Sequence, residues 1–131
     1  MIGVVIVSHS KKIAEGIKEL AGQMGKPEQV IIPVGGTETG ELGTDPMAIL
    51  AAIQKADDGD GVVVLADLGS AVMSVGMAKE MLDPQVSERV YLANAPIVEG
   101  AVAAVIEIAM GSSMDQVLHV AGQAQYMDKA I

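Results

Sequence analysis

The chain has 131 residues, of which 8 are basic and 17 acidic, so its formal net charge at pH 7 is −9. It contains no cysteine, which excludes disulfide frameworks, thiolate metal sites and cysteine nucleophiles. The acidic balance and the near absence of aromatic residues argue against a nucleic-acid partner, which is usually bound through lysine, arginine and stacking side chains.

The length suits a single domain over residues 1–131. The longest stretch without Asp, Glu, Lys or Arg covers residues 116–127, whereas a membrane span needs about 20 apolar residues. No basic segment precedes the apolar start of the chain, which is therefore unlike a secretory signal. We expect a cytoplasmic protein that does not enter the membrane.

Four runs rich in β-branched residues predict strands at residues 2–7, 29–32, 61–65 and 89–92. The first and third runs are continuously apolar, which is typical of strands buried on both faces. A helical pattern follows each strand, so parallel strands joined by right-handed crossovers are expected. The sequence therefore predicts an α/β fold, an open parallel sheet of order 2-1-3-4 with helices on both faces.

The first helix is predicted over residues 10–24. The second opens with Asp45 and Pro46, a capping carboxylate followed by a residue suited to the first helical position. The third is predicted over residues 70–82, and its methionines are interpreted as ordinary core. The apolar positions with helical spacing are Ile13, Ile17, Leu20, Ala21 and Met24, then Ile49, Ala52, Ile53 and Ala56, then Val72, Met73, Met77 and Met81.

A fourth helix, over about residues 96–110, is apolar nearly all round, which indicates burial on more than one side. In so small a domain a second subunit can cover the outer side, and we expect a homodimer that uses this helix. A last helix is predicted over residues 114–126. His119 lies outside the row of apolar residues by which this helix is predicted to face the core. We therefore expect its side chain to be exposed and inert.

Polar residues follow the first and third strands, which are neighbours in the predicted order. His9 follows the first strand and Asp67 the third. Ligands of open α/β sheets bind at the carboxyl ends of strands beside such a switch point. Neutral imidazole is present near pH 7, and a carboxylate that accepts from one ring nitrogen exposes the other. We therefore predict that His9 is a nucleophile for phosphoryl transfer.

Residues near His9 have more than one interpretation. Asp67 can orient His9, bind a metal ion or cap the third helix, and we favour the first. Ser10, Gly69 and Ser70 are candidates to bind the phosphoryl group, because helix N-terminal amides favour anions. An ordinary helix start explains Gly69 and Ser70 equally well.

A long glycine-rich loop, residues 35–44, is predicted at the same edge of the sheet. Loops between strands and helices usually have 2–6 residues, so this length is unusual. Gly36, Thr37, Gly43 and Thr44 are candidates to contact partner proteins, although Thr44 is also a candidate helix cap.

Other chemistries lack their residues in this chain. The GxxxxGK[ST] phosphate loop, the GxGxxG turn after a strand and the GxSxG elbow are absent. No His and Glu cluster has the spacing of metal ligands, so we expect no metal site.

Four segments together carry a resemblance: residues 5–10 (VIVSHS), 43–45 (GTD), 66–71 (ADLGSA) and 94–100 (NAPIVEG). They resemble the phosphocarrier subunits of bacterial phosphoenolpyruvate-dependent dihydroxyacetone kinase. That family is similar to the enzyme IIA component of mannose-type sugar phosphotransferase systems. The likeness runs through essentially the whole chain, so a mannose-type enzyme IIA-like domain is expected.

The resemblance implies a phosphotransferase subunit of glycerol metabolism. His9 matches the active histidine of the family, and Asp67 matches its acidic residue after the third strand. His9 would take a phosphoryl group from the general histidine phosphocarrier protein and pass it to ADP on a nucleotide-binding kinase subunit. Magnesium would travel with that ADP, so this chain would bind no cofactor itself. The family is dimeric, in agreement with the apolar fourth helix.

Two alternatives remain open from the sequence. The chain can be the enzyme IIA component of a mannose-type sugar permease, which uses the same histidine but gives the phosphoryl group to a sugar-specific protein. It can also be a non-catalytic regulatory module that has kept the fold and never holds a covalent phosphoryl group.

Overall fold

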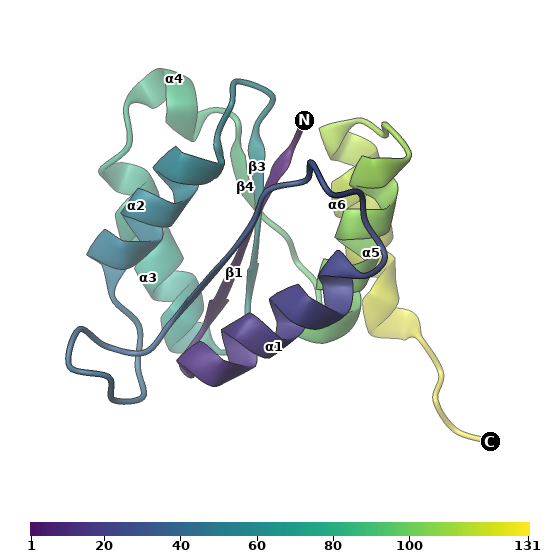
Figure 1. Ribbon diagram of the computed structural model, residues 1–131, viewed down its shortest axis with the longest axis horizontal. Coiled ribbons are helices and arrows are strands. Elements are labelled where there is room, and N and C mark those ends of the chain that lie inside the picture. Colours follow the sequence, from purple (N-terminus) through teal and green to yellow (C-terminus); the bar gives the residue numbers. More distant parts are fainter.

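The computed structural model describes residues 1–131 and places a parallel sheet between two layers of helices (Figure 1). The strand order is β2-β1-β3-β4, as predicted. The strands are β1 (Gly3–Ser8), β2 (Ile31–Gly35), β3 (Val62–Ala66) and β4 (Val90–Leu92). The helices are α1 (Lys11–Gly22), α2 (Pro46–Ala56), α3 (Gly69–Glu80), α4 (Pro84–Ser87), α5 (Ile97–Ala109) and α6 (Met114–Gln123), followed by the 3-10 turn η1 (Ala124–Tyr126).

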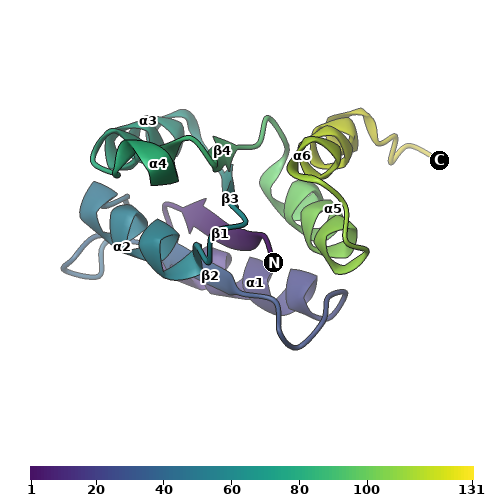
Figure 2. The same cartoon turned by 90° about the horizontal axis from the view of Figure 1, so that it is seen from above.

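The sheet lies between two groups of helices (Figure 2). A separate hydrophobic core fills each side of it. Val4 and Ile6 of β1 point to the side of α1, α5 and α6, whereas Val5 and Val7 point to the side of α2 and α3. All four side chains are fully buried. Because burying an aliphatic side chain of this size contributes about 1.5–3 kcal/mol, this central strand is held firmly from both sides.

The predicted inward faces of the helices are only partly confirmed. In α2 the predicted stripe from Ile49 to Ala56 is buried. Of the residues predicted to face inward from the first helix, Ile13, Leu20 and Met24 are exposed. Ala14 of α1 faces the core together with Ile17 and Ala21. Small residues pack where larger ones were expected, which brings α1 close to the sheet.

The prediction for α3 was wrong. Its bulky residues Val72, Met73, Met77 and Met81 are all exposed. The buried side consists of the smaller residues Ala71, Ser74, Val75 and Ala78. These allow close packing of α3 on the sheet and on α2, which a methionine stripe would prevent. The outer face of α3 is therefore apolar and open to solvent.

Other differences concern element boundaries. Strand β2 extends to Gly35 and contains Pro33, which its position at the edge of the sheet tolerates because one side needs no ladder hydrogen bond. The short helix α4 after Asp83 was not predicted. No helix has the length and hydropathy that crossing a bilayer would require.

Candidate functional site

His9 lies at the carboxyl end of β1, in the turn that leads into α1. On one side of it Ser8 is fully buried and ends the strand. On the other side Ser10 caps α1, because its hydroxyl accepts a hydrogen bond from the backbone N–H of Ile13 at 3.3 Å. The neighbours of His9 are thus fixed by the sheet and by the helix, and His9 extends from a rigid turn.

Asp67 follows β3, the strand next to β1, and lies against His9. Its Oδ1 is 2.9 Å from Nδ1 of the His9 ring, and its Oδ2 accepts the backbone N–H of His9 at 3.0 Å. The hydroxyl of Ser8 also donates to Oδ2, at 2.8 Å, and the Leu68 amide donates to Oδ1 at 2.7 Å. The carboxylate is therefore saturated with donors and held in one orientation.

These donors decide the ionisation of Asp67. Burial raises the pKa of this carboxyl, but hydrogen bonds from His9, Ser8 and the Leu68 amide outweigh that effect and hold the pKa below its ordinary value. Asp67 is consequently an anion at neutral pH, and an anion can only accept from the imidazole.

The position of Asp67 selects the tautomer of His9. Because the carboxylate accepts at Nδ1, the ring carries its proton there, and Nε2 keeps its lone pair. Nε2 faces the hydroxyl of Ser70 in the first turn of α3. The imidazole side chain as a whole is 24% exposed. This is the arrangement of an oriented nitrogen nucleophile.

Two helices begin beside His9, and α3 contacts Nε2 through Ser70. Helix α3 begins at Gly69 without a side-chain cap, so the amides of Gly69 and Ser70 are not satisfied by a capping group. Free amides at a helix N-terminus attract anions. Ser10, in contrast, already uses its hydroxyl to cap α1. The structure brings Ser10, Gly69 and Ser70 to one edge of the sheet, next to His9.

The glycine-rich loop after β2 contacts the main chain of His9. The Gly43 amide donates to the His9 carbonyl at 2.9 Å, and Gly36 and Gly43 both have positive φ angles. Thr37 lies beside Gly43, where a Cβ would be 2.8 Å from the Thr37 methyl group. The loop therefore needs glycine at this contact, and the Gly43 amide supports the main chain of His9.

Thr44 does not cap α2. Asp45 does so, because its carboxylate accepts the Met47 amide at 3.0 Å. The Thr44 hydroxyl instead lies 2.6 Å from the hydroxyl of Ser74 on the buried side of α3. This hydrogen bond ties the glycine-rich loop to α3 and fixes which side of that helix faces inward.

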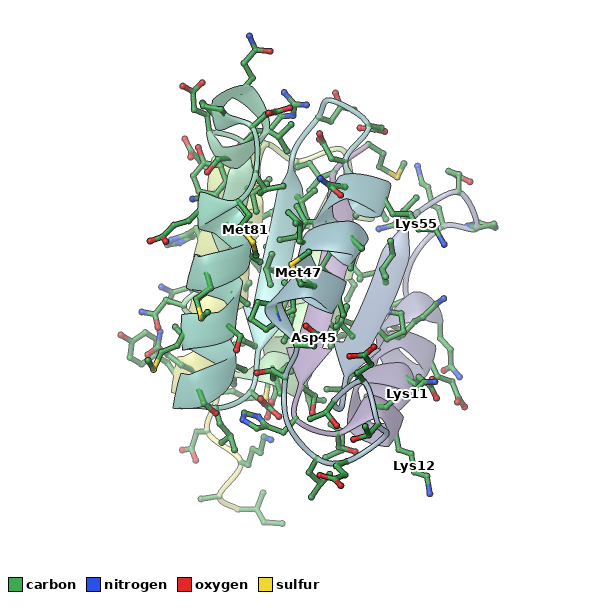
Figure 3. All side chains as sticks on the ribbon, turned by 90° about the vertical axis from the view of Figure 1, so that its left-hand side faces the viewer. Lys11, Lys12, Asp45, Met47, Lys55 and Met81 are labelled. Atoms are coloured by element: carbon green, nitrogen blue, oxygen red, sulfur yellow. The ribbon has the colours of Figure 1, made fainter.

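An open groove of about 800 Å³ lies between this loop and α2. Three lysines line it, and Figure 3 shows Lys11 and Lys12 at the start of α1 with Lys55 at the far end of α2. Gly36 and Thr37 belong to its wall. His9 and Asp67 are not among the lining residues, so the candidate nucleophile is presented at an edge and is not enclosed in a cavity.

Sequence reasoning missed two residues, Ser8 and Ser74. Both are buried hydroxyls, and each holds a polar side chain that belongs to another element. A serine at the end of an otherwise apolar buried strand was the only available signal for Ser8. His119 is exposed, as predicted. No group of three or more His, Asp or Glu side chains is arranged to hold a metal ion.

Comparison with known proteins places this site in a family. The family model described as PTS system fructose IIA component (EIIA-man) matches residues 3–118. The phosphoryl donor subunit DhaM of PEP-dependent dihydroxyacetone kinase 2 from Listeria innocua is 36% identical over 118 residues, which cover 90% of this chain and 94% of that protein. The DhaM subunit from Providencia stuartii is 42% identical over 127 residues, 95% of this chain.

The chain spans 27% of the Providencia protein, but nearly all of the Listeria subunit. A crystal structure of a protein of unknown function, EF1359, superposes with a TM-score of 0.85 at 41% identity, covering 93% of each chain. The predicted family is confirmed: this chain belongs to the mannose-type enzyme IIA family and, within it, resembles the phosphoryl donor subunits of PEP-dependent dihydroxyacetone kinase.

Proposed function

We propose that this chain is a phosphoryl donor subunit of phosphoenolpyruvate-dependent dihydroxyacetone kinase and carries the phosphoryl group on Nε2 of His9. One observation supports this assignment above all. Asp67 accepts at Nδ1, which leaves Nε2 as the nucleophile at an exposed edge of the sheet. A carrier needs such exposure, because a donor and an acceptor must reach the same atom in turn.

The first step is loading from the phosphohistidine of the general histidine phosphocarrier protein. The lone pair of Nε2 attacks phosphorus, the phosphorus–nitrogen bond of the donor breaks, and the donor imidazole leaves. Nδ1 keeps its proton, so positive charge develops in the His9 ring next to the Asp67 carboxylate, which stabilises it. The Gly69 and Ser70 amides and the hydroxyls of Ser10 and Ser70 support the phosphoryl oxygens.

The second step is discharge. An oxygen of the terminal phosphate of ADP attacks the phosphoryl group, the bond to Nε2 breaks, and His9 returns to its starting state. ADP and its magnesium ion are held by the nucleotide-binding kinase subunit, whose ATP then phosphorylates dihydroxyacetone on a third subunit. This chain contributes the histidine and no cofactor, and the loop residues Gly36, Thr37, Gly43 and Thr44 contact the partners.

We also propose that the chain works as a homodimer. The outer side of α5 and the end of α6 form an apolar groove of about 490 Å³. Val98, Val102 and Ile106 of α5 line it. A second copy of the same helix can cover this groove and leave both His9 sites free, because α5 lies on the sheet face opposite to α3.

The relay is tested by the intact mass of the chain after incubation with phosphoenolpyruvate, enzyme I and the histidine phosphocarrier protein, followed by a chase with ADP and the nucleotide-binding subunit. We expect one acid-labile phosphoryl group, absent in His9→Ala and removed by the chase. A group that survives the chase would favour a mannose-type sugar permease. No gain, with donors shown to be active on another acceptor, would favour a non-catalytic module.

A further inference from the structure

Two consecutive residues of the glycine-rich loop hold the two sides of the candidate site. The Gly43 amide donates to the carbonyl oxygen of His9 at 2.9 Å. The hydroxyl of the next residue, Thr44, lies 2.6 Å from the hydroxyl of Ser74 on α3. Because the two contacts come from adjacent residues, the loop sets the spacing between the main chain of His9 and helix α3.

The contact with Ser74 also determines where Ser70 lies. Ser70 and Ser74 are four positions apart on α3, so their side chains share one face of the helix. Ser74 is 9% exposed, and its hydroxyl bonds to Thr44. The hydroxyl of Ser70, one turn earlier, contacts Nε2 of His9. A rotation of α3 that broke the contact with Thr44 would therefore carry Ser70 away from Nε2.

Hydrophobic burial selects the rotation of α3 only weakly, because the outer face of the helix is apolar as well. Met73 and Met77 are exposed there. No side-chain cap holds the first turn, where the N-cap residue is Leu68. A rotation that turned the methionines inward would separate Ser74 from Thr44 and leave a buried hydroxyl without a partner, which is costly. The polar pair therefore supplies the orientation that hydropathy does not.

We propose that Thr44 and Ser74 are positioning residues that hold the Ser70 hydroxyl against Nε2 of His9. The consequence for loading rests on the proposed function of His9. Because Nδ1 carries the ring proton, Nε2 accepts a hydrogen bond from Ser70 in the unphosphorylated carrier. During loading the lone pair of Nε2 forms the bond to phosphorus and the phosphorus–nitrogen bond of the donor breaks. The Ser70 hydroxyl keeps its proton and turns to an oxygen of the phosphoryl group.

This role is separate from that of Asp67. Asp67 contacts Nδ1 and the backbone N–H of His9, and so fixes the tautomer. Thr44 and Ser74 act on the environment of the other ring nitrogen, and only through Ser70. Loss of their hydrogen bond should therefore change Nε2 and leave the proton on Nδ1.

The test removes one hydroxyl at a time. Thr44→Val keeps the shape of the side chain and loses the hydroxyl, whereas Thr44→Ser keeps the hydroxyl. Ser74→Ala removes the other member of the pair. The matched control is Thr39→Val, because the hydroxyl of Thr39 lies 3.2 Å from that of Thr37 within the same loop and makes no hydrogen bond to α3.

Two measurements are made on each variant. The nitrogen chemical shifts of the His9 ring are recorded by NMR without any phosphoryl donor, with Ser70→Ala as the reference for a ring that has lost this hydrogen bond. Loading is then measured with phosphoramidate, a small phosphoryl donor that needs no docking surface. Thr44→Val is also loaded in the Ser70→Ala background, which shows whether its effect passes through Ser70.

We expect Thr44→Val and Ser74→Ala to move the Nε2 shift to the value found in Ser70→Ala, with the Nδ1 shift unchanged. Both should slow loading about five- to tenfold. In the Ser70→Ala background, Thr44→Val should change loading by less than about twofold. Thr44→Ser should restore the Nε2 shift and load faster than Thr44→Val, and Thr39→Val should change neither measurement.

An unchanged Nε2 shift in Thr44→Val would overturn the proposal, as would an unchanged or faster loading rate. Equal slowing in the two backgrounds would also overturn it, because Thr44 would then support the structure without acting through Ser70. If the wild-type chain takes up no phosphoryl group from any donor, the proposed function of His9 fails. The Nε2 shift, which needs no donor, still decides whether the pair positions Ser70.

Discussion

Asp67 holds His9 at two points with one carboxylate. Oδ1 lies 2.9 Å from Nδ1 of the ring, and Oδ2 accepts the backbone N–H of the same residue at 3.0 Å. The second contact anchors the main chain from which the ring extends. A single residue after β3 thus fixes both where His9 lies and which of its nitrogens carries the proton.

Replacement of Asp67 by asparagine should slow loading of His9 by about 10²–10⁴-fold. The amide can donate to Nδ1 and so favours the tautomer in which Nε2 carries the proton, which removes the nucleophile. Asp45→Asn is the matched control, since asparagine caps a helix about as well as aspartate. Both rates are measured with phosphoramidate, and equal rates for wild type and Asp67→Asn would contradict the orienting role.

The same carboxylate should make stability depend on pH in the acid range. Hydrogen bonds hold the pKa of Asp67 below its ordinary value of 3.8, despite burial, so the folded state favours the ionised form. The stabilisation that the ionised Asp67 gives to the folded state is complete above the ordinary pKa of the carboxyl. It is lost as the pH falls through the pKa of Asp67 in the folded state. The difference in unfolding free energy between wild type and Asp67→Asn should therefore shrink as the pH falls below about pH 4. Urea unfolding at each pH measures this difference, and a difference that grows below about pH 4 would contradict the assignment.

Replacement of Ser8 by alanine should lower the free energy of unfolding by about 1–3 kcal/mol, because it leaves buried polar groups unsatisfied. The hydroxyl donates to Asp67 and accepts the Ser10 amide at 3.1 Å. Ser87→Ala, at the half-buried end of α4, should change stability by less than about 0.5 kcal/mol. Thermal and urea unfolding of both variants test this, and equal stabilities would show that Ser8 has no such role.

Gly35→Ala should damage both stability and loading. An added Cβ would lie 2.6 Å from the carbonyl oxygen of Ser10, so the turn that carries His9 must shift. We expect a cost of about 1–3 kcal/mol. Gly16→Ala, in an open position of α1, should instead stabilise the chain by about 0.5–1 kcal/mol. Full loading activity in Gly35→Ala would show that the turn tolerates the shift.

The proposed homodimer predicts that Ile106→Lys is monomeric. A lysine in the apolar groove of α5 would place a charge in the interface, which is costly without a partner. Sedimentation equilibrium at micromolar concentration measures the mass, and Ile13→Lys, an exposed position on α1, is the control. A wild-type chain that is already monomeric would contradict the dimer.

The sequence predicted the topology because its signals were strong and local. Continuous apolar runs marked β1 and β3, and helical patterns between them implied crossovers and the observed strand order. That order was enough to bring His9 and Asp67 to the same edge. The contact itself depends on the register of β1 and β3, in which Val7 pairs with Ala66, and on rotamers that no pattern specifies.

The rotation of α3 could not be predicted from hydropathy. The helix is apolar on both sides, so periodicity does not distinguish the core face from the outer face. The deciding features are the small size of Ala71 and Ala78 and the hydrogen bond between Ser74 and Thr44. A preference for large side chains in the core selects the wrong face here, and the close packing of α2 against α3 reverses it.

The long sequence separation within the site links function to folding. The hydrogen bonds of Asp67 to His9 and Ser8 join residues 58 and 59 positions apart, and Ser70 is 61 positions from His9. Such contacts form only after a long loop has closed, which is slow compared with local helix formation. A growing chain exposes its histidine early but completes the site only when β3 has joined β1. The reactivity of His9 therefore reports when β3 pairs with β1 during refolding.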